Sequence, residues 1–288
     1  MIFCSVIIPT FNRKEKIRKT ILSLLNQSLP KEKFEIIIVD DGSTDSTQNV
    51  VKEFNKKVIY LRQENKGPAA ARNYGIRKAN GGIVVFTDDD CVVPSNWLER
   101  ILSGFEKHKN VVAVGGYLEA PEEILRSNIF ARYESFTSRK NYRVSDKEEV
   151  SGWENPSGGT NNLAYLKRII LEVGGFDETF PTAGGEDADL KWRITQKGYK
   201  FLYLPLKVEH HQDYNFKGFI RQSRNRGSGE FYFSKKWGNV PTRITIFKNL
   251  VFVTLRFFKK LIFEKEIIMN ILDFIFQFNK EKVKLSLL

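Results

Sequence analysis

Three consecutive acids stand where an apolar run of the sequence ends. Asp88, Asp89 and Asp90 follow Ile83–Phe86 after a single threonine. Like charges this close raise one another's pKa unless a cation or dense hydrogen bonding holds them. Mg²⁺ and Mn²⁺ typically take one or two protein carboxylates and complete their coordination with phosphate oxygens. The triplet therefore predicts a divalent ion that bridges the protein to a nucleotide diphosphate, with an exposed acidic turn as the alternative.

Two further apolar runs end in residues suited to a nucleotide. Pro9, Thr10 and Asn12 close the first run, and Asp41 opens an Asp-Gly-Ser sequence after the second. If the two runs are neighbouring strands, their ends offer a carboxylate and amide groups to a base and a ribose. The alternative is a plain turn and helix cap, for which Asp-Gly-Ser is a common sequence.

A helix with small residues in its first turn is predicted after Gly67-Pro68. Such a helix N-terminus can approach a ligand closely, and Arg72 can reach phosphate oxygens. Taken alone this pattern is weak, because alanine-rich helices with one arginine are common.

A second pair of acids, Glu186 and Asp187, follows two glycines at the expected start of another helix. Acids at this position often serve only the helix dipole. A carboxylate at a glycine-flanked helix start can also be held rigidly beside a substrate, so Asp187 is the candidate general base. His210 either completes a metal site with Asp88 and Asp90 or lies on the surface.

These candidates fall between the elements of an alternating pattern. Short β-branched runs without period-2 alternation predict strands buried on both faces, and segments with helical spacing separate them. Repeated β-α units imply a mostly parallel sheet covered by helices, with ligands beyond the carboxyl ends of its strands. We predict an α/β fold with strands at Ser5–Ile8, Glu35–Val39, Val58–Leu61, Ile83–Phe86 and Val111–Val114, and helices at Lys14–Asn26, Ser46–Asn55, Ala69–Ala79 and Asn96–Lys107.

The regular pattern stops after residue 116. Tyr117–Pro156 is polar and rich in Ser, Glu and Lys, so we predict a variable excursion there rather than part of the core. Order is expected to return with a strand at 158–164, helices at Lys167–Val173 and Asp187–Lys197, and a strand at Lys200–Leu204.

Basic charge is concentrated toward the C-terminus. The chain has 46 Lys and Arg against 34 Asp and Glu, and the stretch 217–260 alone holds eleven bases and one acid. A nucleic-acid patch would need surface aromatics or base-reading motifs, and because none is visible we expect no nucleic-acid partner. Two cysteines are too few for a disulfide framework, and the first apolar stretch is too short for a signal peptide, so we expect a cytoplasmic protein.

A helical wheel over 248–262 separates an apolar side from a basic side, with Phe252 as an exception. No uncharged run approaches the roughly 20 residues that span a bilayer. The helix therefore either packs onto the preceding domain or lies in the plane of an anionic membrane leaflet. The apolar side is Leu250, Val251, Leu255, Phe257, Phe258, Leu261 and Ile262, and the basic side is Lys248, Arg256, Lys259 and Lys260.

Taken together and in this order, the motifs resemble those of the family-2 glycosyltransferases of the GT-A fold over about residues 3–230. The resemblance implies an inverting enzyme that uses a nucleotide-diphospho-sugar and Mn²⁺ or Mg²⁺. It divides the chain into a GT-A catalytic domain at 1–235, with a nucleotide-binding half at 1–116 and an acceptor half at 117–235, and a helical amphipathic segment at 236–288. The expected nucleotide-sugar contacts are Pro9, Thr10, Asn12, Asp41, Gly67, Arg72, Asp88 and Asp89.

Individual roles follow by matching the motifs of the family. Asp41 would face the base, and Asp88 and Asp90 would be the outer acids of the DxD element, with Asp90 as the closer metal contact. Asp187 matches the catalytic base, and His210 matches a histidine that contacts metal or diphosphate.

The acceptor side matches the family less fully. Asn162, on the acceptor-side strand, and Glu186, beside the catalytic base, are expected there. However, Leu166-Lys167 stands where the family often has two basic residues. We expect a UDP-linked donor and a saccharide or lipid-linked saccharide acceptor of the cell envelope, at the inner face of the membrane.

Two other classes of protein remain as alternatives. A nucleotidyltransferase also presents acids at strand ends, but it normally has a glycine-rich and basic loop near the N-terminus, and Ile8–Asn12 contains no glycine. A non-catalytic nucleotide-binding protein would not release a nucleoside diphosphate. The identity of the donor sugar is not encoded in the motifs.

Overall fold

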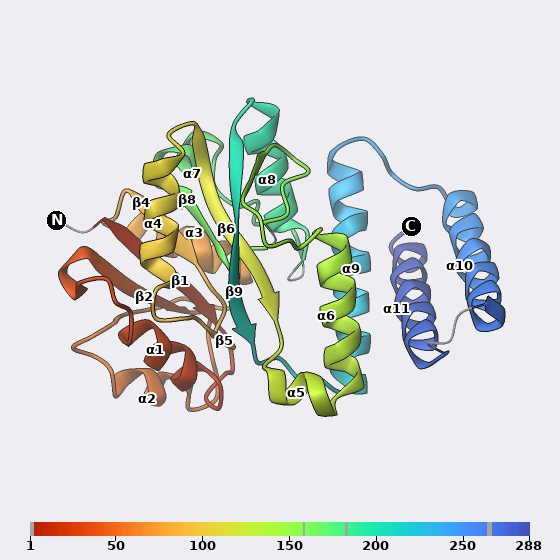
Figure 1. Cartoon of the computed structure of the whole chain (residues 1–288), viewed down its shortest axis with the longest axis horizontal. Coiled ribbons are helices and arrows are strands. Elements are labelled where there is room, and N and C mark those ends of the chain that lie inside the picture. The colour runs from red at the N-terminus through yellow and green to blue at the C-terminus, as the bar shows by residue number, and fades with distance from the viewer. Residues whose placement is uncertain (1–2, 158, 182–183, 264–266) are drawn as a thin grey trace.

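The computed structural model describes residues 3–157, 159–181, 184–263 and 267–288. Its centre is a nine-stranded sheet with the strand order β3-β2-β1-β4-β8-β6-β9-β5, and β7 also pairs with β9 (Figure 1). The strands are β1 (Cys4–Thr10), β2 (Phe34–Asp40), β3 (Ile59–Arg62), β4 (Ile83–Phe86), β5 (Cys91–Val92), β6 (Val111–Glu119), β7 (Glu149–Ser151), β8 (Leu163–Leu166) and β9 (Lys200–His210).

Most of the strands run in one direction. β1 pairs in parallel with β2 and β4, β2 with β3, and β6 with β9. β8 runs antiparallel between β4 and β6, which leaves those two strands parallel to each other. The carboxyl ends of β1, β2, β4 and β9 therefore open toward the same side of the sheet, as the sequence predicts.

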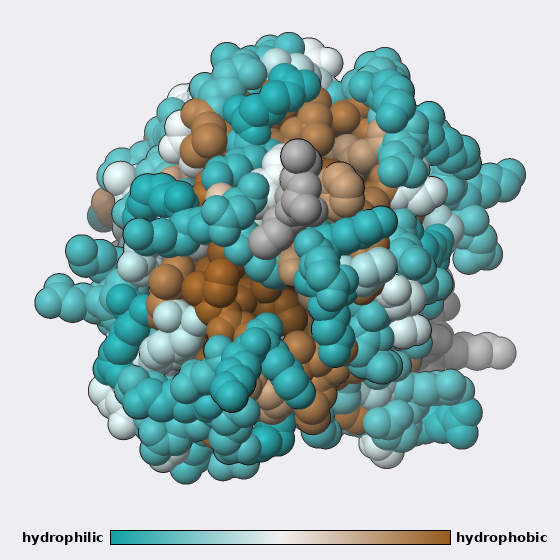
Figure 2. Space-filling view, turned by 90° about the vertical axis from the view of Figure 1, so that its left-hand side faces the viewer, coloured by the Kyte–Doolittle hydropathy of each residue, from teal (hydrophilic) through white to brown (hydrophobic). Residues whose placement is uncertain are grey.

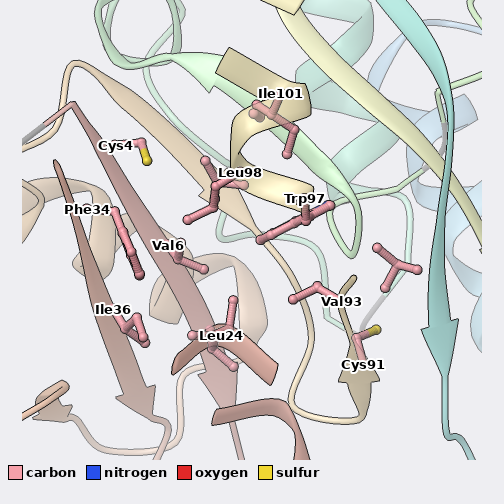
Figure 3. Close-up of a cluster of buried hydrophobic side chains, with 14 of the residues drawn as sticks. Cys4, Val6, Leu24, Phe34, Ile36, Cys91, Val93, Trp97, Leu98 and Ile101 are labelled. Atoms are coloured by element: carbon pink, nitrogen blue, oxygen red, sulfur yellow. The ribbon is translucent and has the colours of Figure 1, made fainter. Parts of the chain in front are cut away.

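Helices cover both faces of the sheet. Their bounds are α1 (Ile17–Leu25), α2 (Thr47–Lys52), α3 (Pro68–Lys78), α4 (Trp97–Lys107), α7 (Lys167–Glu172) and α8 (Glu186–Gln196), and a 3₁₀ turn, η1 (Lys31–Lys33), precedes β2. One core cluster joins the sheet to α1, α2 and α4 through residues such as Leu24, Val51 and Trp97. Figure 3 shows Leu24 and Trp97 among its members. A second cluster joins the opposite face to α3, α7 and α8. The predicted helices are thus present, with bounds shifted by a few residues.

Two sequence predictions need correction. The strand expected at 158–164 begins only at Leu163, because residues 159–162 form a turn in which the Asn162 N–H donates to the Gly159 carbonyl (3.4 Å); Gly158 lies outside the described residues. The predicted excursion is largely regular, since β6 extends to Glu119 and two helices, α5 (Glu122–Ser127) and α6 (Ile129–Asn141), follow it before β7. The many polar residues of this stretch obscured the spacing of apolar residues that indicates a helix.

Three long helices complete the chain: α9 (Phe216–Lys236), α10 (Arg243–Phe263) and α11 (Ile267–Ser286). α11 packs against α6 and α9 around Tyr133, Phe219 and Phe276, and α10 packs on α11 on the outside of the molecule (Figure 1). Among the helices that the structure describes, none is long and apolar enough to cross a membrane.

The apolar residues of α10 are divided between two faces. Phe257 stacks on Phe274 of α11 with 4.6 Å between ring centroids, whereas the large apolar side chains on the outer face are exposed. The side chains of Lys259, Lys260, Leu261 and Ile262 lie outside the described residues. Figure 2 shows the opposite end of the molecule, which is mainly hydrophilic and has a group of apolar residues near its centre. The outer face of α10 lies at the far end from that view. Its exposed members are Ile244, Phe247, Val251, Phe252, Leu255 and Phe258.

Candidate active site

Asp41 organises the loop that leads into α3. Its carboxylate accepts hydrogen bonds from the backbone N–H groups of Lys66 (2.9 Å) and Gly67 (2.8 Å) and from Gln63 Nε2 (2.7 Å). Gly67 has a positive φ of 88°, which favours glycine at this turn. Asp41 therefore fixes the N-terminus of α3, and its contact with a base stays a prediction.

The end of β1 lies beside the end of β2, as predicted. Thr10 pairs with Asp40 in the parallel register. Asn12, with a φ of 54°, accepts hydrogen bonds at its side-chain oxygen from the backbone N–H groups of Thr44 (2.8 Å) and Asp45 (3.2 Å). Asn12 thus locks two loops together, while Pro9 and Thr10 form the adjoining strand end.

Arg72 is buried between α3 and α8. Its Nη1 lies 2.9 Å from Glu186 Oε1, and its Nη2 lies 3.2 Å from Asp88 Oδ1. The guanidinium carbon lies 5.7 Å from the ring centroid of Phe176. Arg72 Nε is buried without a hydrogen-bond partner among the described residues. An unsatisfied charged donor is costly, which indicates a ligand or water at this point.

The three acids after β4 have different surroundings. Arg13 Nε lies 3.4 Å from Asp89 Oδ1, but burial and the charge of Asp90 raise the pKa of Asp89 to about 7. Burial also opposes ionisation of Asp90, yet His210, with Nε2 3.2 Å from Asp90 Oδ1, outweighs it and lowers the pKa of Asp90. Each of the three acids therefore has a cationic group beside it, which is Arg72 for Asp88, Arg13 for Asp89 and His210 for Asp90.

Ligand atoms of Asp90, Cys91 and His210 lie within 4.8 Å of one another. Burial raises the pKa of the Cys91 thiol, so the carboxylate and the imidazole are the better donors. A carboxylate with an imidazole beside it suits Mn²⁺, and phosphate oxygens can complete the coordination. The residues present therefore fit the predicted ion, although the individual ligand assignments stay predictions.

The pair Glu186 and Asp187 opens α8. Gly185, with a φ of 95°, packs so tightly on α9 that an added Cβ would lie 2.9 Å from Gly229 O. Glu186 is buried, and its carboxylate binds Arg72 and the backbone N–H of Gly184. Asp187 accepts a hydrogen bond from Ala188 N, and an added Cβ on Gly159 would lie 2.6 Å from Asp187 Oδ2. Asp187 is thus held by its neighbours with one oxygen turned away from the helix.

A cavity of about 710 Å³ gathers part of the predicted site. Arg72, Asp88, Glu186, Asp187 and His210 line it, together with residues of α6, α9 and α11. The other candidates do not line this cavity in the part of the chain that the structure describes; they are Pro9, Thr10, Asn12, Asp41, Gly67, Asp89, Asp90 and Asn162. The cavity therefore begins at the acids after β4 and extends away from the strand ends proposed for the nucleotide.

Asn162 has a role inside the fold. Its Nδ2 donates to the carbonyls of Tyr117 (3.1 Å) and Leu206 (2.8 Å), and its Oδ1 accepts from Trp97 Nε1 (2.8 Å). Asn162 is 1% exposed. A contact between Asn162 and an acceptor stays a prediction that would require these bonds to rearrange.

Two site residues were missed at the sequence level. Arg13 forms an ion pair with Asp89, and the only available signal was a basic residue shortly after the first strand. Lys191, one turn after Asp187, donates to the carbonyls of Asn155 (2.7 Å) and Ser157 (3.3 Å). These bonds tie the loop before β8 to α8, and no sequence pattern indicated them.

Comparison with known proteins decides the family. The family model described as Glycosyl transferase family 2 matches residues 5–169, more than half of the chain. The chain belongs to glycosyl transferase family 2. This confirms the predicted resemblance and the enzyme class, a glycosyltransferase.

Relatives of this family-2 member include the glycosyltransferase AglE of Haloferax volcanii, which is 30% identical over 79% of this chain and 73% of its own length. The chondroitin synthase of Escherichia coli is 28% identical over 73% of this chain and 34% of its own length. The chain therefore spans about a third of the length of some relatives and nearly three quarters of others.

Solved structures confirm the GT-A fold. The mannosyltransferase PcManGT of Pyrobaculum calidifontis, in complex with GDP-Man and Mn²⁺, has a TM-score of 0.60 at 18% identity and covers 99% of this chain and 74% of its own. Residues 1–349 of S. aureus TarS, in complex with UDP, have a TM-score of 0.56 at 18% identity and cover 92% of this chain and 73% of that chain.

Proposed function

We propose that this family-2 member transfers a sugar from a nucleotide-diphospho-sugar to a hydroxyl of a saccharide acceptor, with inversion at the anomeric carbon. The observation that carries the proposal is one cavity lined by Asp187, Arg72, Asp88 and His210. Among the described residues, Asp187 has no cationic side-chain partner at hydrogen-bonding distance. A carboxylate of this kind, next to a buried arginine and a group of acids, is the arrangement that a proton acceptor beside a diphosphate requires.

Asp187 would accept the proton of the acceptor hydroxyl at its free carboxylate oxygen as that hydroxyl attacks the sugar. Arg72, whose charge is held in place by Glu186, would lie along the departing diphosphate and offset its negative charge. No covalent intermediate on the protein is required, because the acceptor hydroxyl displaces the diphosphate directly. Glu186 is held by Arg72 through a hydrogen bond.

Asp90 and His210 would hold the divalent ion, with Asp88 beside them. A bound divalent ion supplies Lewis-acid stabilisation of the diphosphate. Among the solved structures of similar fold, TarS carries UDP, and GalNAc-T7 carries UDP, GalNAc and Mn²⁺. We propose a UDP-linked donor, and a GDP-linked donor is the other outcome of the test.

A second proposal concerns the membrane. The exposed outer face of α10 carries large apolar residues, and the exposed Lys248 and Arg256 lie on the same helix. Such a helix suits the plane of an anionic cytoplasmic leaflet, with the enzyme bound peripherally beside a lipid-linked envelope saccharide. The minor teichoic acid biosynthesis protein GgaB of Bacillus subtilis, 26% identical over 86% of this chain and 26% of its own length, supports an envelope role.

The test is release of nucleoside diphosphate from a panel of UDP-, GDP- and dTDP-sugars with Mn²⁺ or Mg²⁺, with and without saccharides. We expect one UDP-sugar to be turned over. Asp187→Asn should keep donor affinity within about threefold and lose transfer, because an amide keeps the shape and cannot accept the proton. Asp146→Asn, at an exposed acid outside the cavity, is the matched control. Absence of turnover on every donor would overturn the proposed function.

A further inference from the structure

Two exposed aromatic side chains line the same cavity as Asp187. Tyr142, directly after α6, is 44% exposed, and Trp153, in the loop after β7, is 37% exposed. Both belong to the stretch that the sequence suggested was a variable excursion. Large apolar side chains left partly exposed inside a concave site favour a bound ligand, because covering them removes apolar area from water.

The side chain of Tyr142 lies in the lining of the cavity. Among the residues that the structure describes, no hydrogen bond, ion pair or ring contact engages its phenol. The phenol lies within electrostatic range of Asp187, Arg226 and Glu230. Tyr142 thus offers a ring face and a hydroxyl to whatever occupies the space in front of the proposed base.

Trp153 is held in place. Its ring stacks on Phe233 at 5.9 Å between centroids, with an angle of 15° between the planes. It also meets Trp192 edge to face at 5.3 Å. Lys191 fixes the following residues through their backbone carbonyls. Trp153 therefore forms a rigid wall, which a positioning surface for a substrate needs.

The remaining lining indicates the chemistry of the occupant. The cavity lining carries both positive and negative side chains, so its charge does not favour a ligand of one sign. Many lining side chains are neutral hydrogen-bonding groups, including Ser138, Asn141, Asn161, Asn225, Ser234 and Gln277. A pyranose ring matches this lining. Its C–H faces pack on the negative faces of aromatic rings, and the hydroxyls around its rim form hydrogen bonds with neutral polar side chains.

We propose that Tyr142 and Trp153 form a subsite for a pyranose ring of the acceptor, whose hydroxyl faces Asp187. The cavity continues past this point to Phe276, Gln277 and Lys280 of α11, so the acceptor is an extended saccharide whose further units reach the C-terminal helix. This inference rests on the proposed function and names the acceptor class for the same site.

The experiment uses the full chain, the donor identified by nucleotide release, and p-nitrophenyl glycosides of glucose, galactose, N-acetylglucosamine, N-acetylgalactosamine and mannose, with their disaccharides, as acceptors. We expect at least one glycoside to accelerate nucleotide release, with the disaccharide giving a lower KM than its monosaccharide. Tyr142→Ala should raise the KM for that acceptor about tenfold, because the ring face that packs on the pyranose is lost. Tyr142→Phe keeps the ring, so its KM for the acceptor should lie between those of the wild type and Tyr142→Ala.

Phe136→Ala is the matched control, because Phe136 is 54% exposed on α6 and lies outside the cavity lining. It should behave as wild type. Equal KM values for wild type and Tyr142→Ala would overturn the subsite. Donor hydrolysis that no glycoside accelerates would also overturn the subsite. That result would not contradict the assignment as a transferase. A wild-type protein that hydrolyses no nucleotide-sugar would overturn the proposed function itself.

Discussion

Glu186 Oε1 lies 2.9 Å from Arg72 Nη1, and this buried ion pair joins the start of α8 to α3. The adjacent Asp187 faces the cavity and has no cationic side-chain partner at hydrogen-bonding distance among the described residues. Two neighbouring acids therefore have different roles: Glu186 holds the arginine that would lie along the diphosphate, and Asp187 stays available for proton transfer. Glu186 and Asp187 differ in role because their side chains point in different directions from the start of α8.

Replacing only one partner of the Arg72–Glu186 pair should lower the free energy of unfolding more than replacing both partners. Glu186→Met leaves the buried Arg72 with Asp88 alone, and we expect it to lower the free energy of unfolding by about 3 kcal/mol. Adding Arg72→Met removes the stranded charge, so the double variant should be more stable than Glu186→Met. Urea unfolding measures both. Glu122→Met, which breaks the exposed pair with Arg126, should cost under about 0.5 kcal/mol. A double variant less stable than Glu186→Met would contradict this account.

The position of the proposed base can be disturbed without touching it. In Gly159→Ala the new Cβ would lie 2.6 Å from Asp187 Oδ2, so the carboxylate must move. We expect kcat to fall at least about tenfold, because small displacements of a reacting group are costly, with little change in donor affinity. Gly152→Ala is the control, since no atom lies within 4 Å of its added Cβ. Similar kcat values for the two variants would count against Asp187 as the base.

The stability of the protein should depend on pH through Lys191. Burial lowers the pKa of Lys191 from its ordinary value of 10.5 to about 8. Between these values the unfolded chain binds more protons than the folded one, so this residue makes the free energy of unfolding rise with pH. Lys191→Met should remove that part of the rise. Denaturant unfolding of both proteins at pH 7.5 to 10.5 tests it, and parallel profiles would refute the assignment.

A divalent ion should be required for turnover. We expect Asp90→Ala to abolish nucleotide release and chelator to do the same in the wild type, because Asp90 is the carboxylate proposed to hold the ion beside His210. Asp146→Ala, at an exposed acid outside the cavity, should leave activity unchanged. Full activity in the presence of chelator would show that the ion is not needed.

The outer face of α10 should bind anionic vesicles. Changing Phe247, Leu255 and Phe258 to serine removes exposed apolar area, and changing Lys248 and Arg256 to glutamine removes charge; both should lower co-sedimentation with phosphatidylglycerol liposomes. Binding of the wild type should weaken with salt. The matched control changes Leu22, Phe136 and Leu171, which are also exposed. A wild-type protein that stays in the supernatant at low salt would exclude the membrane proposal.

The sequence by itself determined the fold class, the order of the strand-end motifs and the family. The buried strands carry uninterrupted apolar runs, and each motif lies directly after one of them, so that local pattern and chain order are sufficient. Parallel pairing then brings the ends of β1, β2 and β4 to one edge, because their register follows from burial of both faces.

Tertiary structure alone decided which side chains work together. Asn162 reads as a polar residue near the acceptor, yet its amide joins β6, β9 and α4 inside the core. Tyr142 lies in a stretch with no signal of function, and it enters the cavity only because α6 packs beside α9 and α11. The direction of a side chain and the neighbours that cover it depend on contacts between distant segments. Local spacing does not contain that information.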